Sequence, residues 1–279
     1  HDTRYHGIYL YNRSTTNDVQ IVENTVYNIT NFSYWGIYVN NRGNSPHLSM
    51  VNNTVYGGQG GGLYLYNDYR YGTITPLIEG NTLRDNNNTG LYVRNYRGTH
   101  TPLVKQNTVY NNGNHGIQFD YNYSDAFQPQ ITLNDVHGNG GHGLSIRTNQ
   151  FATVVHNNIY NNTTSGIYLT NTGDVSRINF NNIYGNQGDY ALHNNSSVLV
   201  DARYNWWDAA PKLEMDAGTN PKNITRLFDI YDDGNKGTID YSHWLSAQQT
   251  VSTATAASWV KAPADGETLK ATTYQIEGS

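Results

Sequence analysis

The sequence contains no cysteine among its 279 residues, which excludes disulfide bonds and thiolate metal sites. This absence leaves the compartment open, because secreted solenoid proteins without disulfides exist. Lysine and arginine total only 17, form no basic run and leave a formal net charge of −5. Nucleic acid and anionic membrane surfaces are therefore not expected as partners. No apolar run approaches the length of a spanning helix, so membrane insertion is not expected either.

A repeat of 23 to 29 residues dominates the chain instead. Each copy has an Asn, a small residue and an aliphatic residue, followed by a polar turn and a Gly-aliphatic-x-aliphatic run. A period in this range is typical of solenoid proteins. The repeated Asn residues are Asn24, Asn53, Asn81, Asn107, Asn134, Asn157 and Asn181. The repeated Gly residues are Gly7, Gly36, Gly62, Gly90, Gly116, Gly143 and Gly166.

Four columns of this alignment are almost entirely aliphatic and indicate the buried positions. Two of them lie one and three residues after the Gly, as in Leu91 and Val93. A spacing of two between buried positions is the period of a β-strand. Three short strands per repeat, joined by turns rich in Asn and Gly, predict an all-β fold. We expect a right-handed parallel β-helix of about eight coils with an irregular C-terminal cap.

The repeated Asn residues are interpreted as an internal ladder in which each side chain bonds to the Asn of the next coil. We expect each Asn to occupy a turn where its tolerance of left-handed backbone is needed. The turns Tyr66 to Pro76 and Tyr121 to Pro129 are longer than the others. They are expected to protrude as loops that wall one face of the stack.

The expected organisation has four parts. Coils occupy residues 1–207, the cap 208–245, a Ser/Thr/Ala/Gln-rich linker 246–261, and a trailing segment 262–279. An Asp-rich stretch in the cap, 232–240, echoes a calcium loop, but its ligand positions fall on Gly234 and Lys236. No cofactor is therefore expected, with calcium as the one candidate.

Two stretches resemble known families. Ala202-Arg-Tyr-Asn-Trp-Trp207 and residues 228–245 resemble the closing segment of extracellular parallel β-helix repeat proteins of the pectate-lyase-like superfamily. Asp208 and His243 stand where that family usually has Gly and Pro. Residues 262–278 resemble the first strands of a bacterial immunoglobulin-like domain. The resemblance implies a multidomain protein that is secreted or displayed at the cell surface.

Aromatic residues recur at positions that the strand period turns outward. They would pave one side of the solenoid, and phenol rings offer sugars an apolar face with a polar tip. A polysaccharide or cell-surface glycan is the expected partner, because strands repeat at about 4.8 Å, close to the length of one sugar unit. The alternative is that these rings only stack on one another. The predicted substrate-binding residues are Tyr9, Tyr11, Trp35, Tyr38, Tyr64, Tyr66, Tyr92 and Tyr168.

The tyrosine column is interrupted in coils four to six by acidic, basic and imidazole side chains. Arginine can neutralise a uronate carboxylate, while His or Tyr can move a proton. A second hypothesis is therefore a lyase, C5-epimerase or hydrolase acting on an acidic glycan, although Arg94, Asp120 and Arg147 could equally form a salt-bridge ladder. The candidate catalytic residues are Tyr92, Arg94, His115, Asp120, His142 and Arg147. A third hypothesis is a stalk, adhesin or fibre module that associates end to end through strand edges.

Overall fold

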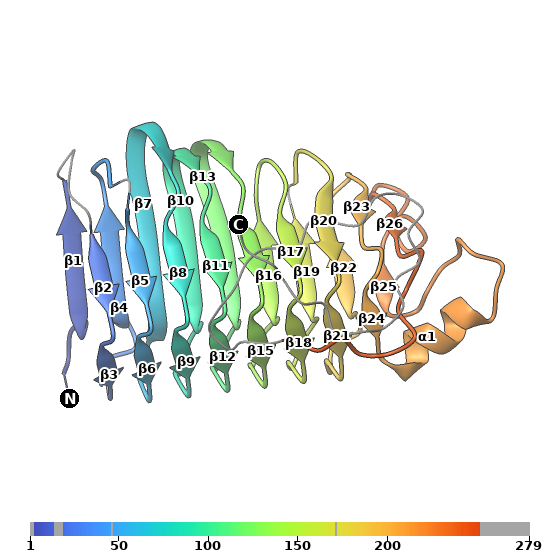
Figure 1. Cartoon of the computed structure of the whole chain (residues 1–279), viewed down its shortest axis with the longest axis horizontal. Helices are drawn as coiled ribbons and strands as arrows, with labels where there is room; N and C mark the ends of the chain where they lie inside the picture. Colours follow the sequence, from blue (N-terminus) through green and yellow to red (C-terminus); the bar gives the residue numbers. More distant parts are fainter. Residues whose placement is uncertain (1–2, 14–18, 46, 171, 252–279) are drawn as a thin grey trace, which may run out of the picture.

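The computed structural model describes residues 3–13, 19–45, 47–170 and 172–251. The predicted linker is thus described only as far as Val251, and the trailing segment 262–279 lies outside the described residues. Successive strands stack along the long axis of the molecule as a parallel solenoid with three sheets (Figure 1). The predicted fold class is confirmed.

The first sheet contains the strands that follow each repeated Gly, and all its neighbours pair in parallel. Its strands are β1 (Ile8–Asn12), β4 (Trp35–Asn41), β7 (Gly61–Ile74), β10 (Leu91–His100), β13 (Ile117–Phe127), β16 (Leu144–Arg147), β19 (Ile167–Thr170), β22 (Leu192–Asn194) and β25 (Leu227–Phe228).

The second and third sheets flank the repeated Asn. The second contains β2 (Gln20–Val22), β5 (Ser49–Val51), β8 (Leu77–Glu79), β11 (Leu103–Lys105), β14 (Gln130–Thr132), β17 (Thr153–Val155), β20 (Ser176–Asn179), β23 (Val200–Asp201) and β26 (Ile239–Asp240). The third contains β3 (Thr25–Tyr27), β6 (Thr54–Tyr56), β9 (Thr82–Arg84), β12 (Thr108–Tyr110), β15 (Asp135–His137), β18 (Asn158–Tyr160), β21 (Asn182–Tyr184) and β24 (Trp206–Trp207).

The aliphatic columns form the core, as predicted. Leu63, Leu91, Ile117 and Leu144 are fully buried one above the other, and the columns of the other two sheets are buried in the same way. Because each coil contributes about four such side chains, the apolar interior stays narrow along the whole stack.

The predicted Asn ladder is present between the second and third sheets. The Asn107 side chain donates to the Asn134 Oδ1 atom at 2.9 Å and accepts from the Asn81 Nδ2 atom at 2.9 Å. Its amide also donates to the carbonyl oxygens of Ile78 and Lys105, so the polar groups of the turn are satisfied without water. The ladder continues one step further than predicted, to Asn205.

The left-handed backbone falls elsewhere than expected. The residue immediately before the ladder Asn adopts positive φ, as in Gln106 (56°), Leu133 (57°) and Phe180 (58°). The ladder Asn is therefore selected for its hydrogen bonds, and the left-handed turn is formed by its neighbour.

Two further Asn ladders were not predicted. One lies between the third and first sheets and consists of Asn86, Asn112, Asn139, Asn162 and Asn186. The other crosses the first four strands of the first sheet and consists of Asn12, Asn41, Asn67 and Asn95. In the first coil, Ile29 occupies the position that corresponds to Asn86 and Asn112 in later coils, and it is buried.

The two long turns are strands for most of their length, which corrects the prediction of loops. β7, β10 and β13 continue past their neighbours at the upper edge of Figure 1 and pair with one another there. A paired extension satisfies backbone groups that a loop would leave to solvent.

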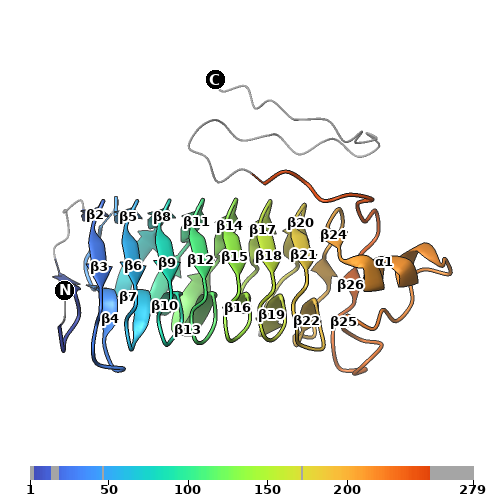
Figure 2. The same cartoon turned by 90° about the horizontal axis from the view of Figure 1, so that it is seen from below.

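The cap closes the stack at the end opposite β1 (Figure 2). Helix α1 (Ala209–Asp216) buries Pro211 and Met215, and Trp207 is buried beside it. β25 and β26 join the first and second sheets, so the cap continues the coil pattern irregularly. Within the described residues, no helix is long and apolar enough to cross a membrane.

Candidate functional site

Row 1 is the line of outward side chains two residues after each repeated Gly. The strand register places them next to one another across the first sheet, as predicted. Row 1 consists of Tyr9, Tyr38, Tyr64, Tyr92, Gln118, Ser145, Tyr168 and His193.

The rings of row 1 pack on one another. Ring centroids are 5.5 Å apart for Tyr9 and Tyr38, 5.0 Å for Tyr38 and Tyr64, and 4.6 Å for Tyr64 and Tyr92. Tyr64 and Tyr92 are stacked at 13°, so each ring covers a face of the other. Burial raises the pKa of Tyr64 to about 12. Stacking therefore leaves the edges of the row 1 rings more open than their faces.

The predicted aromatic Trp35 lies over the row rather than in it. Its ring is 5.1 Å from that of Tyr64 and 6.0 Å from that of Tyr92. A Cβ atom at Gly61 would fall 2.2 Å from the indole, so glycine is needed there to admit the ring. Tyr168 stacks on His142 at 4.9 Å, beyond the interruption of the row.

Row 2 lies two residues further along the same strands. Its members are Tyr11, Asn40, Tyr66, Arg94, Asp120, Arg147 and Thr170. The two rows are adjacent lines of side chains on one face.

The structure brings together three of the candidate catalytic residues. The Tyr92 hydroxyl donates to Asp120 Oδ2 at 3.2 Å, and Arg147 bonds to Asp120 Oδ1 at 2.9 Å. Arg94 donates to Asn122 at 3.1 Å instead of to Asp120. The alternating salt-bridge ladder is thus formed on one side of Asp120 only. Burial and the Asp120 carboxylate both raise the pKa of Tyr92.

His115 and His142 stack on each other with centroids 5.1 Å apart. The Nδ1 atom of His115 accepts the backbone N–H of His142, and Nδ1 of His142 accepts that of Ser165. Both rings are therefore neutral with the proton on Nε2. Burial lowers the pKa of His115, and burial followed by the nearby His115 lowers the pKa of His142 to about 4. A ring with Nδ1 occupied and Nε2 protonated has no free lone pair, so neither is suited to act as a base.

We call the paired extension of β7, β10 and β13 beyond row 2 the flange. None of its exposed side chains beyond row 2 was among the site residues predicted from the sequence. Tyr71 and Tyr123 are 77% and 73% exposed. Their nearest rings, Tyr69 and Tyr96, meet them edge to face at 76° and 86°. The signal was present in the sequence, because three consecutive coils have long connections at this position.

The family description "right handed beta helix region" matches residues 35–203, more than half of the chain. The chain belongs to the right-handed β-helix family. No curated protein and no solved structure matches it. Membership of the right-handed β-helix family establishes the architecture. The chemistry depends on the side chains that a given β-helix carries on the outer surface of its coils.

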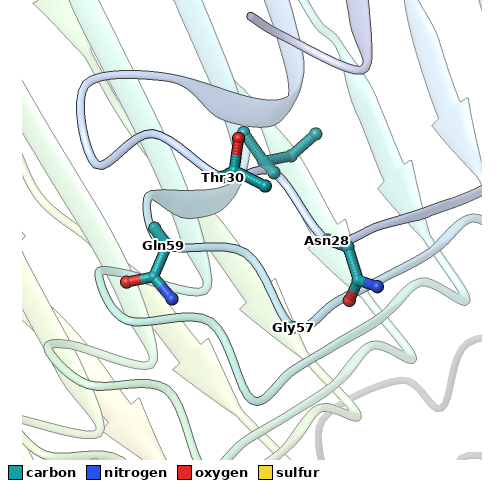
Figure 3. A pocket seen from close by; sticks show the side chains of 5 residues that line it. Asn28, Thr30, Gly57 and Gln59 are labelled. Atoms are coloured by element: carbon teal, nitrogen blue, oxygen red, sulfur yellow. The ribbon is translucent and has the colours of Figure 1, made fainter. Parts of the chain in front are cut away.

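A hollow in this right-handed β-helix lies away from the row face, where the chain leaves β3 and β6. Its lining residues are Asn28, Ile29, Thr30, Gly57 and Gln59 (Figure 3). None of these side chains ionises near neutral pH, so the hollow offers no acid or base for catalysis.

The calcium-like loop of the cap bonds to its own backbone. The Asp229 carboxylate accepts the N–H groups of Tyr231 and Ile239, and Asp233 accepts that of Asn235. Among the described residues, no group of three or more acidic or histidine side chains could hold a metal ion. The loop is therefore explained by turn formation.

Proposed function

We propose that this β-helix is a carbohydrate-binding module of a secreted or cell-surface protein. In this proposal a polysaccharide lies along the solenoid axis on rows 1 and 2. The observation that carries the proposal is the register of Tyr9, Tyr38, Tyr64 and Tyr92 on neighbouring strands. This register repeats an aromatic edge and a hydroxyl group at about 4.8 Å, the spacing of strands in a sheet.

Row 2 supplies further hydrogen-bonding groups beside each ring. Tyr66 and Arg94 neighbour Asn40 and Asp120 across the sheet. Sugar hydroxyls both donate and accept, so a mixed line of phenol, amide, guanidinium and carboxylate groups suits them. A face that extends over successive strands also fits a polymer better than it fits a small molecule, which binds in concave pockets.

Binding fits the geometry better than catalysis does. Asp120 is the only carboxylate of rows 1 and 2, and Tyr92 and Arg147 already engage it. Glycoside hydrolysis uses a pair of carboxyl groups, and lyases or epimerases need a free base. His115 and His142 are both bonded through Nδ1. Catalysis on an acidic glycan and end-to-end association both stay predictions.

Affinity electrophoresis through gels containing soluble polysaccharides tests the proposal. The double substitution Tyr38→Phe and Tyr64→Phe keeps the stacked rings but removes two hydroxyl groups from row 1. We expect it to weaken retention by a retaining polysaccharide. The matched control is Tyr160→Phe and Tyr184→Phe, which removes two hydroxyl groups from stacked rings of the third sheet. Equal retention of wild type and both variants would refute the use of row 1.

A further inference from the structure

The flange differs from rows 1 and 2 in how its strands pair. Asp68 and Thr73 of β7 pair with Arg97 and Thr99 of β10, so four residues of β7 face the single residue Gly98. Residues 69–72 form a bulge beside Gly98 of β10. A Cβ atom at Gly98 would fall 2.0 Å from the Tyr69 carbonyl oxygen, and φ there is 75°. Glycine at this position allows the bulge to approach.

Ring orientation is the second difference. In row 1 the rings of Tyr64 and Tyr92 lie nearly parallel and cover each other. On the flange the rings of Tyr96 and Tyr123 meet at 86° with centroids 5.5 Å apart. An edge-to-face contact covers a face of only one of the two rings, so the pair leaves more ring face open than a stacked pair does. The high exposure of Tyr71 and Tyr123 agrees with this geometry.

Guanidinium groups accompany the open rings. The guanidinium carbon of Arg70 lies over one face of the Tyr71 ring, 5.8 Å from its centroid. That of Arg97 lies over the Tyr96 ring at 5.0 Å, and Arg97 pairs with Tyr123 across the strands. Arg97 shares Asp68 with Arg42, at 3.7 Å and 3.4 Å. The Arg97 guanidinium has five N–H donors, and its contact with Asp68 does not use all of them. Each side of the flange therefore combines an apolar ring face with hydrogen-bond donors.

We propose that the flange is a separate sugar-binding subsite, which takes the apolar C–H face of pyranose rings on Tyr71 and Tyr123. Arg70 and Arg97 donate to the hydroxyl groups of the same sugars. The subsite rests on the proposed function, because its ligand is a branch or a neighbouring stretch of the polysaccharide on rows 1 and 2. It assigns ring stacking to the flange and hydroxyl contacts to row 1.

The double substitution Tyr71→Ala and Tyr123→Ala tests the subsite by affinity electrophoresis with the polysaccharide that retains wild type. Both side chains are exposed, so the fold is expected to survive, and an unchanged thermal midpoint verifies this. We expect about a tenfold loss of affinity, since two ring contacts are removed. The matched control is Phe32→Ala, which removes an aromatic side chain that is 79% exposed in another loop. It should leave affinity unchanged.

The outcomes separate the two proposals. If the flange variant binds like wild type while Tyr38→Phe and Tyr64→Phe weaken binding, the subsite is refuted and the proposed function stands. If Phe32→Ala weakens binding as much as the flange variant, the contact is unspecific and the subsite is refuted. If wild type binds no polysaccharide, both proposals are refuted.

Discussion

The side-chain Nδ2 atom and the backbone N–H group of Asn107 both donate to the same acceptor, Asn134 Oδ1, at 2.9 Å. Each ladder Asn thus fixes the turn of the coil before it through two bonds to one oxygen. Because the donor and the acceptor belong to different coils, the ladder joins neighbouring coils as well as satisfying each turn. This arrangement underlies every surface described above.

Replacing Asn107 by Leu should lower the free energy of unfolding by about 2 to 4 kcal/mol, since buried partners in coils on both sides lose their bonds. Asn24 is only half-buried and donates to Asn53 and Val22. Asn24→Leu should therefore cost clearly less. Urea denaturation of both variants measures the difference, and equal losses would contradict the ladder as described.

Leu133 should be replaceable with a gain in stability. It adopts φ of 57°, a left-handed conformation that costs residues other than Gly and Asn roughly 1 to 2 kcal/mol. Leu133→Asn should raise the thermal midpoint, whereas the β-branched substitution Leu133→Ile should lower it. If both variants shift the midpoint in the same direction, side-chain packing and not backbone strain governs this turn.

Acid should destabilise the protein partly through His100. This side chain is fully buried, and neither ring nitrogen has a hydrogen-bond partner, so burial lowers its pKa to about 3. The unfolded chain takes up this proton near pH 6.5 and the folded chain only near pH 3, so stability falls as the pH falls through that window.

The substitution His100→Phe should flatten this pH dependence. Phe127 occupies the paired position one coil further on, which shows that a phenyl ring suits this column. Urea denaturation at pH 7.5 and pH 4.5 gives the difference for each protein. Other histidines with lowered pKa values, such as His142, keep part of the effect. Parallel losses in wild type and His100→Phe would exclude a contribution from His100.

The segment after the cap bonds to Asn182, and the side chains of His156 and Tyr184 also bond to Gln249 and Gln248. The amide of Asn182 donates to the Gln249 carbonyl oxygen at 2.8 Å and accepts the Gln249 N–H at 2.9 Å. Asn182→Ala should therefore speed hydrogen exchange at Gln249 while slow exchange persists in the core strands. Unchanged exchange at Gln249 would mean that other contacts hold this segment.

The sequence was sufficient to predict the coils because their interior is one-dimensional. Each column, such as Leu91 and Ile117, needs only an aliphatic residue at a fixed spacing, and the register follows from the period. The two additional Asn ladders follow the same logic, since Asn112 and Asn95 recur five residues after Asn107 and Gly90. They could have been predicted by aligning one more column each.

The chemistry of the face could not be predicted in the same way. The period puts Tyr64 and Tyr92 on one row, but stacked and edge-on rings arise from side-chain rotamers that the spacing does not determine. The partner of Arg94 likewise depends on how far its long side chain extends, to Asn122 past Asp120. To predict the flange, one would have to know that the extra residues of β7, β10 and β13 pair with one another. This pairing joins residues far apart in the sequence.

Hydrogen exchange followed by mass spectrometry, with and without a saturating polysaccharide, tests the central claim most directly. The account predicts slower exchange within 8–12, 35–41, 61–74, 91–100 and 117–127, which carry the aromatic part of row 1, the neighbouring part of row 2 and the flange. Exchange in the second and third sheets should be unchanged. Protection confined to the cap or to the third sheet, or no protection by any polysaccharide that the protein retains, would contradict the account.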